Sequence, residues 1–179
     1  MGKLAGGFID VYLLEKSRVT YQSPNERSYH IFYFMVTHVV DLHEEALLSD
    51  NIYDYPSVSM GKVKVDSIDD GEEMQIMDEA FDILGFTRTE KYDVYRVSAV
   101  CMHLSRLEFT GMGEMASPKN LDAGETLNKI LNFADTGETL YDAFINPKYK
   151  VEIVHISCQS KFIFFLQRLE LSGSIRHRI

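Results

Sequence analysis

The sequence contains few cysteines and no long apolar run, and each shortage excludes a class of protein. Two of its 179 residues are cysteine, Cys101 and Cys158, which is too few for a disulfide scaffold. No stretch reaches the roughly 18 consecutive apolar residues of a membrane-spanning helix, and residues 1–7 do not begin a signal peptide. The net charge of −9 argues against a protein that binds nucleic acid by neutralising its phosphates. We therefore expect a cytoplasmic protein with no membrane segment and no nucleic-acid partner.

The charge is unevenly distributed along the chain. Apolar residues make up 45% of the sequence, which is enough for a folded core. Residues 1–151 carry a net charge of −11, whereas residues 152–179 carry +2. The charged residues of this tail are Glu152, Lys161, Arg168, Glu170, Arg176 and Arg178. The change of sign predicts a domain over residues 1–151 and a separate tail over residues 152–179.

The first third of the chain predicts one strand, one long helix and a loop. Apolar and polar residues alternate at period two over residues 8–14, which favours a strand. Ser23, with proline after it and Glu26 three residues on, is typical of a helix start, and apolar spacing continues that helix to Val40. Residues 49–67 predict a loop with one or two weak edge strands.

The remaining pattern is mostly helical. A helix is expected to open at Asp69 and end at Gly85, and a second is expected to start from a capping box of Thr87 and Glu90. Glycines and a proline predict an irregular stretch over residues 109–119. Two short helices are then expected, capped by Asp122 with Glu125 and by Asp135 with Glu138, the second ending at Asn146.

Motifs that carry catalytic or binding chemistry are weak in this sequence. Gly61–Val63 and Gly2–Leu4 lack the upstream glycine and the hydroxyl residue of a phosphate-binding loop. Cys101 and His103 lie two residues apart on a predicted helix and so face apart, whereas zinc needs three or four converging ligands. We interpret three histidines as residues at the surface or at the edge of the core, and not as metal ligands: His30, His38 and His43.

The sequence contains the residue types of two further catalytic arrangements. A nucleophilic Cys101 with His30 as its base has no sequence feature that places the two together. A general acid/base pair could come from a cluster of carboxylates, although helix caps and the helix dipole explain its first four members. The cluster comprises Asp69, Asp70, Glu72, Glu73, Asp78 and Glu79. We predict no catalytic, cofactor-binding or metal-binding residue in this chain.

Several strings nevertheless resemble the head of the myosin heavy chain. They match in order and spacing: GKLAG at residues 2–6, YLLEKSRV at 12–19, ERSYHIFY at 26–33 and DEAFDILGF at 78–86. NIYDY at residues 51–55 and DDGEEMQ at 69–75 resemble the conventional, muscle-type class II. The resemblance covers about residues 2–150. It stops after NPKYKV at residues 146–151, so residues 152–179 are interpreted as non-family sequence.

The resemblance implies a fold, an activity and partners. It places the chain in the upper 50-kDa subdomain of a P-loop NTPase-type motor, as an α+β, mostly α fragment with one or two strands of the central sheet. The family is an actin-activated ATPase of the cytoskeleton and the myofibril that uses ATP and Mg²⁺. Its P-loop, switch I and switch II have no counterpart in these 179 residues. We therefore expect a chain that is inactive alone and has no cofactor of its own.

The implied partners are actin filaments and the rest of the myosin heavy chain. Lys148 and Lys150 match the entry to an actin-facing loop and are the candidate actin-proximal residues. The alternative is a small non-enzymatic interaction module that binds actin or a chaperone, which a basic surface around these two lysines would favour.

Overall fold

The computed structural model of the chain separates into two compact units. One comprises residues 1–14 and 149–179, and the other residues 15–148. The structure describes residues 2, 6–8, 10, 12–37, 39–112, 115–132 and 135–147. The predicted tail over residues 152–179 lies outside the described residues, as do Lys148, Lys150 and His38.

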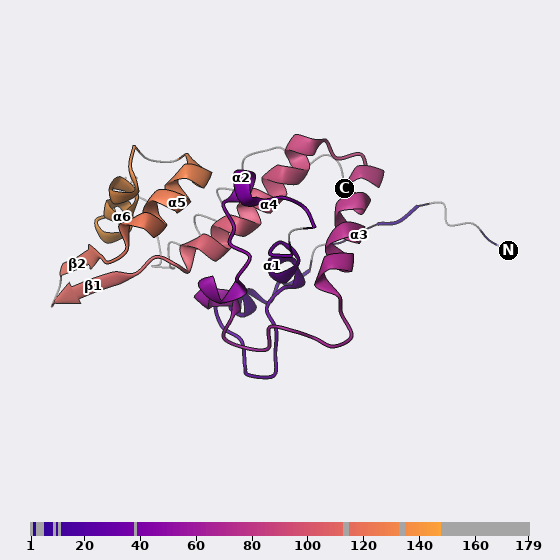
Figure 1. The fold of residues 1–179 in the computed structure, drawn as a ribbon, viewed down its shortest axis with the longest axis horizontal. Coiled ribbons are helices and arrows are strands. Elements are labelled where there is room, and N and C mark those ends of the chain that lie inside the picture. Colours follow the sequence, from indigo (N-terminus) through magenta and orange to yellow (C-terminus); the bar gives the residue numbers. More distant parts are fainter. Residues whose placement is uncertain are drawn as a thin grey trace. The chain divides into compact units, whose positions relative to one another are not determined.

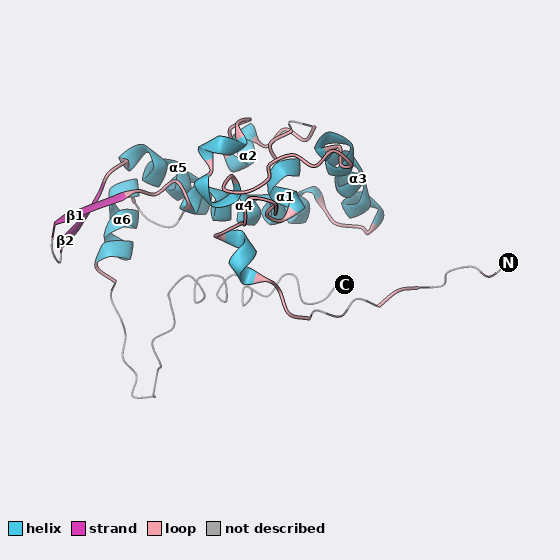
Figure 2. Ribbon diagram, turned by 90° about the horizontal axis from the view of Figure 1, so that it is seen from below, coloured by secondary structure: helices cyan, strands magenta, loops and turns pink. Residues whose placement is uncertain are grey.

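Helix α4 (Arg88–Leu104) is the element around which the unit of residues 15–148 is built. Helix α1 (His30–Phe34) contacts both α4 and α3 (Asp70–Ile83), and α2 (His43–Ala46) packs on α4 (Figures 1 and 2). Short 3-10 helices at Lys16–Val19, Ile52–Asp54 and Pro56–Val58 complete this region. The amphipathic α4 thus supplies one long face on which several short segments bury their apolar side chains.

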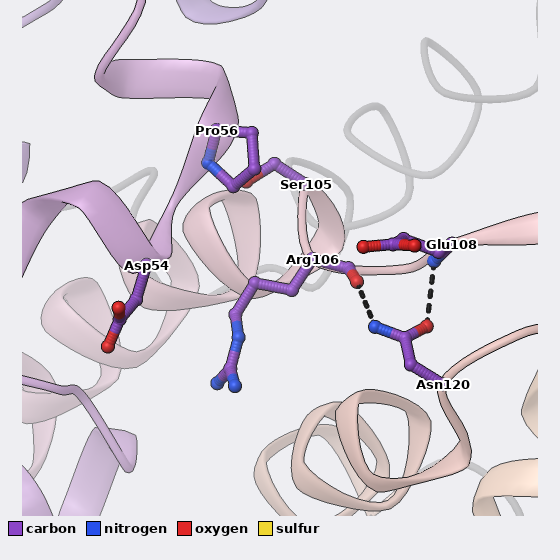
Figure 3. Close-up of a pocket in the computed structure, with 6 residues that line it drawn as sticks. All are labelled: Asp54, Pro56, Ser105, Arg106, Glu108 and Asn120. Atoms are coloured by element: carbon purple, nitrogen blue, oxygen red, sulfur yellow. Dashed lines mark hydrogen bonds between the residues drawn. The ribbon is translucent and has the colours of Figure 1, made fainter.

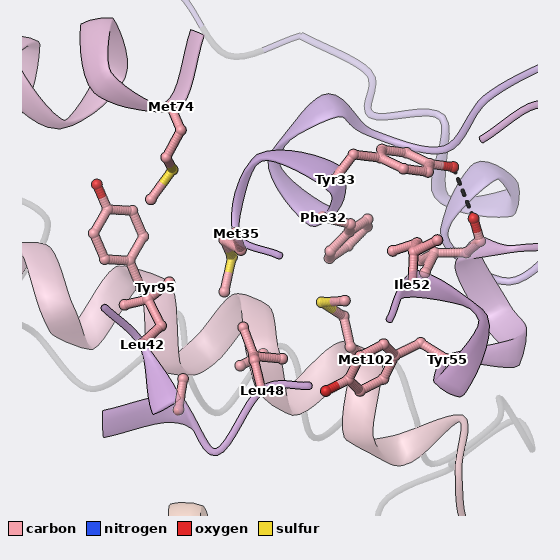
Figure 4. Close-up of a cluster of buried hydrophobic side chains, with 13 residues drawn as sticks. Phe32, Tyr33, Met35, Leu42, Leu48, Ile52, Tyr55, Met74, Tyr95 and Met102 are labelled. Carbon is pink, nitrogen blue, oxygen red and sulfur yellow. Dashed lines mark hydrogen bonds between the residues drawn. The ribbon is translucent and has the colours of Figure 1, made fainter. Parts of the chain in front are cut away.

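The hydrophobic core lies between α4, α1, α3 and the segment of residues 42–58 (Figure 4). Tyr55, Tyr95 and Met74 are fully buried in it. The Tyr33 hydroxyl donates to the Val58 carbonyl at 2.7 Å, so its polar atom is satisfied inside the core. Each large apolar side chain buried here contributes about 1.5–3 kcal/mol of transfer free energy. The buried members are Phe32, Tyr33, Met35, Leu42, Ala46, Leu48, Ile52, Tyr55, Val58, Met74, Tyr95, Ala99 and Met102.

Helices α5 (Leu121–Leu131) and α6 (Gly137–Ile145) pack together beyond the end of α4. A methyl group on Gly137 would lie 2.4 Å from the Glu125 backbone nitrogen, and one on Gly124 would lie 2.6 Å from the Tyr141 ring. The two glycines therefore permit a close approach that any side chain would prevent.

An antiparallel hairpin joins α4 to α5. Strand β1 (Phe109–Met112) pairs with β2 (Met115–Pro118), with Phe109 opposite Pro118, and β2 contacts α6 (Figure 1). The prediction of an irregular stretch over residues 109–119 was wrong. Its glycine and proline are compatible with pairing because Pro118 stands at the end of an edge strand, where no ladder donor is required.

The predictions for α3 and α4 are confirmed. The Asp69 carboxylate accepts the backbone N–H groups of Gly71 and Glu72, which caps α3. Gly85 has a φ of +82°, the left-handed conformation expected after a helix end. Thr87 and Glu90 form the reciprocal capping box that starts α4.

The long helix predicted from Ser23 to Val40 was wrong, because α1 comprises five residues. Ser23 and Glu26 instead close a turn, in which the Glu26 N–H donates to the Ser23 carbonyl. Hydrogen bonds from the Ser23 hydroxyl and N–H lower the pKa of Glu26. The Glu26 carbonyl then accepts the N–H of Lys62 at 2.7 Å, so it does not begin a helix.

Other predicted boundaries also need correction. Phe8, Asp10 and residues 12–14 are in no strand, and no described residue pairs with them. Residues 49–67 contain two 3-10 helices and no strand. Helix α5 begins at Leu121, so Asp122 lies inside its first turn; the N-cap residue Asn120 bonds the hairpin base and does not cap the helix with its side chain. Helix α6 begins at Gly137 and is capped by Thr136, not by Asp135.

Where the second short helix ends, the prediction is confirmed, since Asn146 terminates α6. The predicted fold class is also confirmed at the level of a mostly helical α+β fragment with a small sheet. Among the helices that the structure describes, none is long and apolar enough to cross a membrane.

Candidate functional site

A small open depression lies where α4 ends and the hairpin begins (Figure 3). Its volume is about 260 Å³, and residues from three separate parts of the sequence line it. Ser105 and Arg106 follow the last turn of α4, Glu108 precedes β1, and Asn120 precedes α5. The last two lining residues, Asp54 and Pro56, come from the two 3-10 helices. Chain segments that are remote in sequence therefore meet at this place.

Asn120 holds the depression together. Its amide nitrogen donates to the Arg106 carbonyl at 2.6 Å, and its amide oxygen accepts the Glu108 N–H at 2.8 Å. The same oxygen accepts the hydroxyl of Tyr141 in α6 at 2.6 Å. One side chain thus joins the end of α4, the base of the hairpin and α6, which fixes the backbone on which Arg106 is carried.

Both carboxylates at the rim are already engaged. The Asp54 carboxylate accepts hydrogen bonds from Ser49 and Asn51, at 2.6 and 3.0 Å. The Glu108 carboxylate forms an ion pair with Lys119. The half-buried Arg106 differs from them. Its guanidinium stands 5.9 Å from the Tyr55 ring centroid and has no ion pair or hydrogen bond with any described residue.

Helices α3 and α4 are joined by a second polar cluster, built around Lys91. The Lys91 amine lies 2.8 Å from the Asp82 carboxylate and 3.0 Å from that of Asp78, and the side chain of Lys91 is 8% exposed. Burial alone would lower the pKa of Lys91, but hydrogen bonds to the two carboxylates raise it. Tyr95 donates to Asp78 at 2.9 Å. All these groups bind one another, so the cluster connects two helices and presents no free acid or base.

Arg27 makes a comparable connection at the start of α3. Its guanidinium lies 3.8 Å from the Tyr33 ring centroid and 2.6 Å from the Asp70 carboxylate. The Arg27 side chain is 5% exposed. The pair ties the turn that follows Ser23 to the first turn of α3, and its stacked, buried geometry suits a structural role.

The two residues considered for a metal site have separate roles. His103 is 1% exposed, and its Nε2 lies 2.9 Å from the Ala46 carbonyl oxygen. Burial, with a smaller contribution from the positive charge of Arg106, lowers the pKa of His103 to about 4. Cys101 packs partly buried against the core. Across the described ranges, no group of three or more potential ligands could hold a metal ion.

The Cys101 and His30 pair receives no support from the geometry. His30 is exposed and stacks on Phe34, with ring centroids 5.9 Å apart. Burial raises the pKa of the Cys101 thiol, which is the opposite of the shift that activates a nucleophilic cysteine.

The carboxylate cluster of α3 is accounted for mainly by structural contacts. Asp69 caps the helix, Asp70 pairs with Arg27, and Asp78 pairs with Lys91. Glu79 accepts a hydrogen bond from Gln75.

The depression around Arg106 was not predicted from the sequence, because nothing local distinguishes Arg106 from the other basic residues of the chain.

The comparison with protein families identifies the chain. A family model described as the myosin head (motor domain) matches residues 1–164, which is most of the sequence. The match spans the boundary expected at residues 151–152, and that boundary remains a prediction. The strings at residues 2–6, 12–19, 26–33 and 78–86 all lie within the matched region. The chain therefore belongs to the myosin head (motor domain) family.

Proposed function

We propose that the chain is a segment of an actin-based motor that couples ATP hydrolysis to movement along actin filaments. The observation that carries this proposal is the family match over residues 1–164. The strings NIYDY and DDGEEMQ support the conventional, muscle-type class II and a position in the upper 50-kDa subdomain of the P-loop NTPase-type head. The partners are then actin and the rest of the heavy chain, in the cytoskeleton or the myofibril.

The exposed apolar side chains near the N-terminus support a place within a larger head. Phe8, Tyr12 and Leu13 are 91%, 93% and 86% exposed. Large apolar groups that are exposed together mark a surface that another part of a protein covers. The alternative of a small interaction module has no comparable observation in its favour, because Lys148 and Lys150 lie outside the described residues.

A graft tests the motor proposal. Residues 1–151 would replace the corresponding segment of a complete muscle-type myosin head, and the actin-activated ATPase rate of the hybrid would be measured. We expect the hybrid to keep this activity, because the segment would regain its neighbours. A head rebuilt by the same procedure with its own original segment is the control. Loss of activity in a folded hybrid would contradict the proposal.

The 179-residue chain alone is expected neither to bind nor to hydrolyse ATP. The reason is chemical: its glycines do not form the phosphate-cradling loop that ATP binding in this family requires. The measurement is titration with a fluorescent ATP analogue with and without Mg²⁺, using a complete myosin head as the positive control. Saturable, Mg²⁺-dependent binding at micromolar concentration would show that the proposal of an inactive segment is wrong.

A further inference from the structure

Among the residues that the structure describes, none forms an ion pair or a hydrogen bond with the Arg106 guanidinium, whereas the other polar groups of the depression are bonded. The Ser105 hydroxyl donates to the Met102 carbonyl at 2.7 Å, and both ends of the Asn120 amide are bonded. Asp54 is held by Ser49 and Asn51, and Glu108 by Lys119. Among the described residues, none pairs with the Arg106 guanidinium, so its donors remain available to a ligand.

The surroundings of Arg106 favour one kind of ligand. A guanidinium presents parallel N–H donors that match the two oxygens of a carboxylate. The depression carries two carboxylates of its own at its rim, Asp54 and Glu108, which repel a phosphate dianion more than a carboxylate monoanion. Pro56 also lines the depression and adds an apolar surface beside the guanidinium.

The size of the depression indicates where that carboxylate comes from. Pockets that enclose small molecules have volumes of roughly 300–1,000 Å³ and bury most of the ligand. The depression here holds about 260 Å³ and is open, which suits one side chain that projects from a larger surface. The chain has a net charge of −9, so it does not attract an acidic partner at long range. The attraction has to come from direct contact between the Arg106 guanidinium and a carboxylate of the partner.

We propose that the depression is a docking site for a protein partner, in which Arg106 binds an aspartate or glutamate side chain through a two-pronged ion pair. The site uses residues that the motor proposal does not involve, so it stands independently of that proposal. Asn120 is the positioning residue, because it fixes the backbone of Arg106 and Glu108.

A nuclear magnetic resonance titration of the full chain tests the site. The probe is the peptide acetyl-Gly-Glu-Gly-amide, and the signal is the Nε–Hε resonance of Arg106 in the ¹⁵N-labelled chain. We expect a saturable shift with this peptide and none with its glutamine counterpart. Inorganic phosphate is expected to bind more weakly than the glutamate peptide. Equal shifts with the glutamine peptide, or tighter binding of phosphate, would overturn the proposal.

Matched variants locate the binding, which is followed through the backbone amide of Glu108. Arg106→Gln should abolish binding of the glutamate peptide. Arg106→Lys should weaken that binding about tenfold, because lysine keeps the positive charge but lacks the two parallel N–H donors of the guanidinium. Arg88→Gln removes the same charge from an exposed site that is paired with Glu45, and should leave binding unchanged. Asp54→Asn should strengthen binding, because it removes a repelling carboxylate. Undiminished binding in a folded Arg106→Gln chain would show that the site is wrong.

Discussion

Replacement of Gly61 by alanine is expected to lower the free energy of unfolding by about 3 kcal/mol. The added methyl carbon would lie 2.2 Å from the Glu26 carbonyl oxygen and 2.6 Å from that of Ser23. Both neighbours are backbone atoms, so a change of side-chain rotamer cannot relieve the clash. The chain would have to break the 2.7 Å hydrogen bond from Lys62 to Glu26 and move the turn that begins at Ser23.

The effect can be measured by urea unfolding of the full chain, followed by circular dichroism at 222 nm. Gly7→Ala is the matched control, because a methyl group there meets nothing within 4 Å. The control should change the unfolding free energy by no more than about 0.5 kcal/mol. Equal urea midpoints for Gly61→Ala and the unmodified chain would mean that the close approach of the two backbones is not required for folding.

The close approach of the backbone at Gly61 and Lys62 to Glu26 also explains why the prediction of a long first helix was wrong. The residues from Ser23 to Glu26 satisfy one another locally in a turn just as they would at a helix start. What decides the outcome is the Glu26 carbonyl, which is bonded to Lys62, 36 positions later in the chain. The sequence shows the local capping pattern of Ser23 and Glu26, but it does not show that the Lys62 N–H binds the Glu26 carbonyl.

Helices α3 and α4 could be predicted because every signal that specifies them is local. Asp69, Gly85 and the box of Thr87 and Glu90 lie within one turn of the helix ends that they define. The prediction that Asp122 and Glu125 cap the start of α5 was wrong because a contact distant in sequence decides the outcome. Glu125, which was expected to cap its own helix, accepts the N–H of Gly137 at the start of α6 instead.

The depression around Arg106 could not be predicted from spacing. Its lining residues come from positions 54–56, 105–108 and 120, and the hairpin that brings Glu108 and Asn120 together was itself missed. Neither FTGM nor MASP alternates apolar and polar residues at period two, and the glycines with Pro118 favour a loop. Recognition of the family, by contrast, needed only ordered strings, and the family match confirms it.

The stability of the chain is expected to fall by about 3 kcal/mol between pH 6.5 and pH 4 because of His103 alone. Its Nε2 faces the Ala46 carbonyl oxygen and therefore carries the proton, which leaves Nδ1 as the site of further protonation. Nδ1 is buried and has no acceptor among the described residues, so the imidazolium would bury an unpaired N–H. These surroundings hold the pKa of His103 at about 4, against 6.5 in the unfolded chain.

The sign of the effect follows from proton binding. Above pH 6.5 the imidazole is neutral in both states and contributes no pH dependence. Between pH 6.5 and pH 4 the unfolded chain binds a proton that the folded chain does not, so each unit of pH lost costs about 1.4 kcal/mol. Below pH 4 both states are protonated at this site and the loss is complete.

Urea unfolding measured from pH 7.5 to pH 4 in the unmodified chain and in His103→Gln isolates this contribution. Glutamine keeps an N–H that can donate to Ala46 and does not titrate, so the variant should lose stability less steeply as the pH falls, even if its stability at pH 7.5 is lower. The carboxylates titrate in both chains, and the difference between the two pH profiles therefore reports His103. His30→Gln is the matched histidine-to-glutamine control at an exposed position. If His103→Gln and the unmodified chain show parallel profiles, protonation of the buried imidazole does not limit the acid stability of this fold.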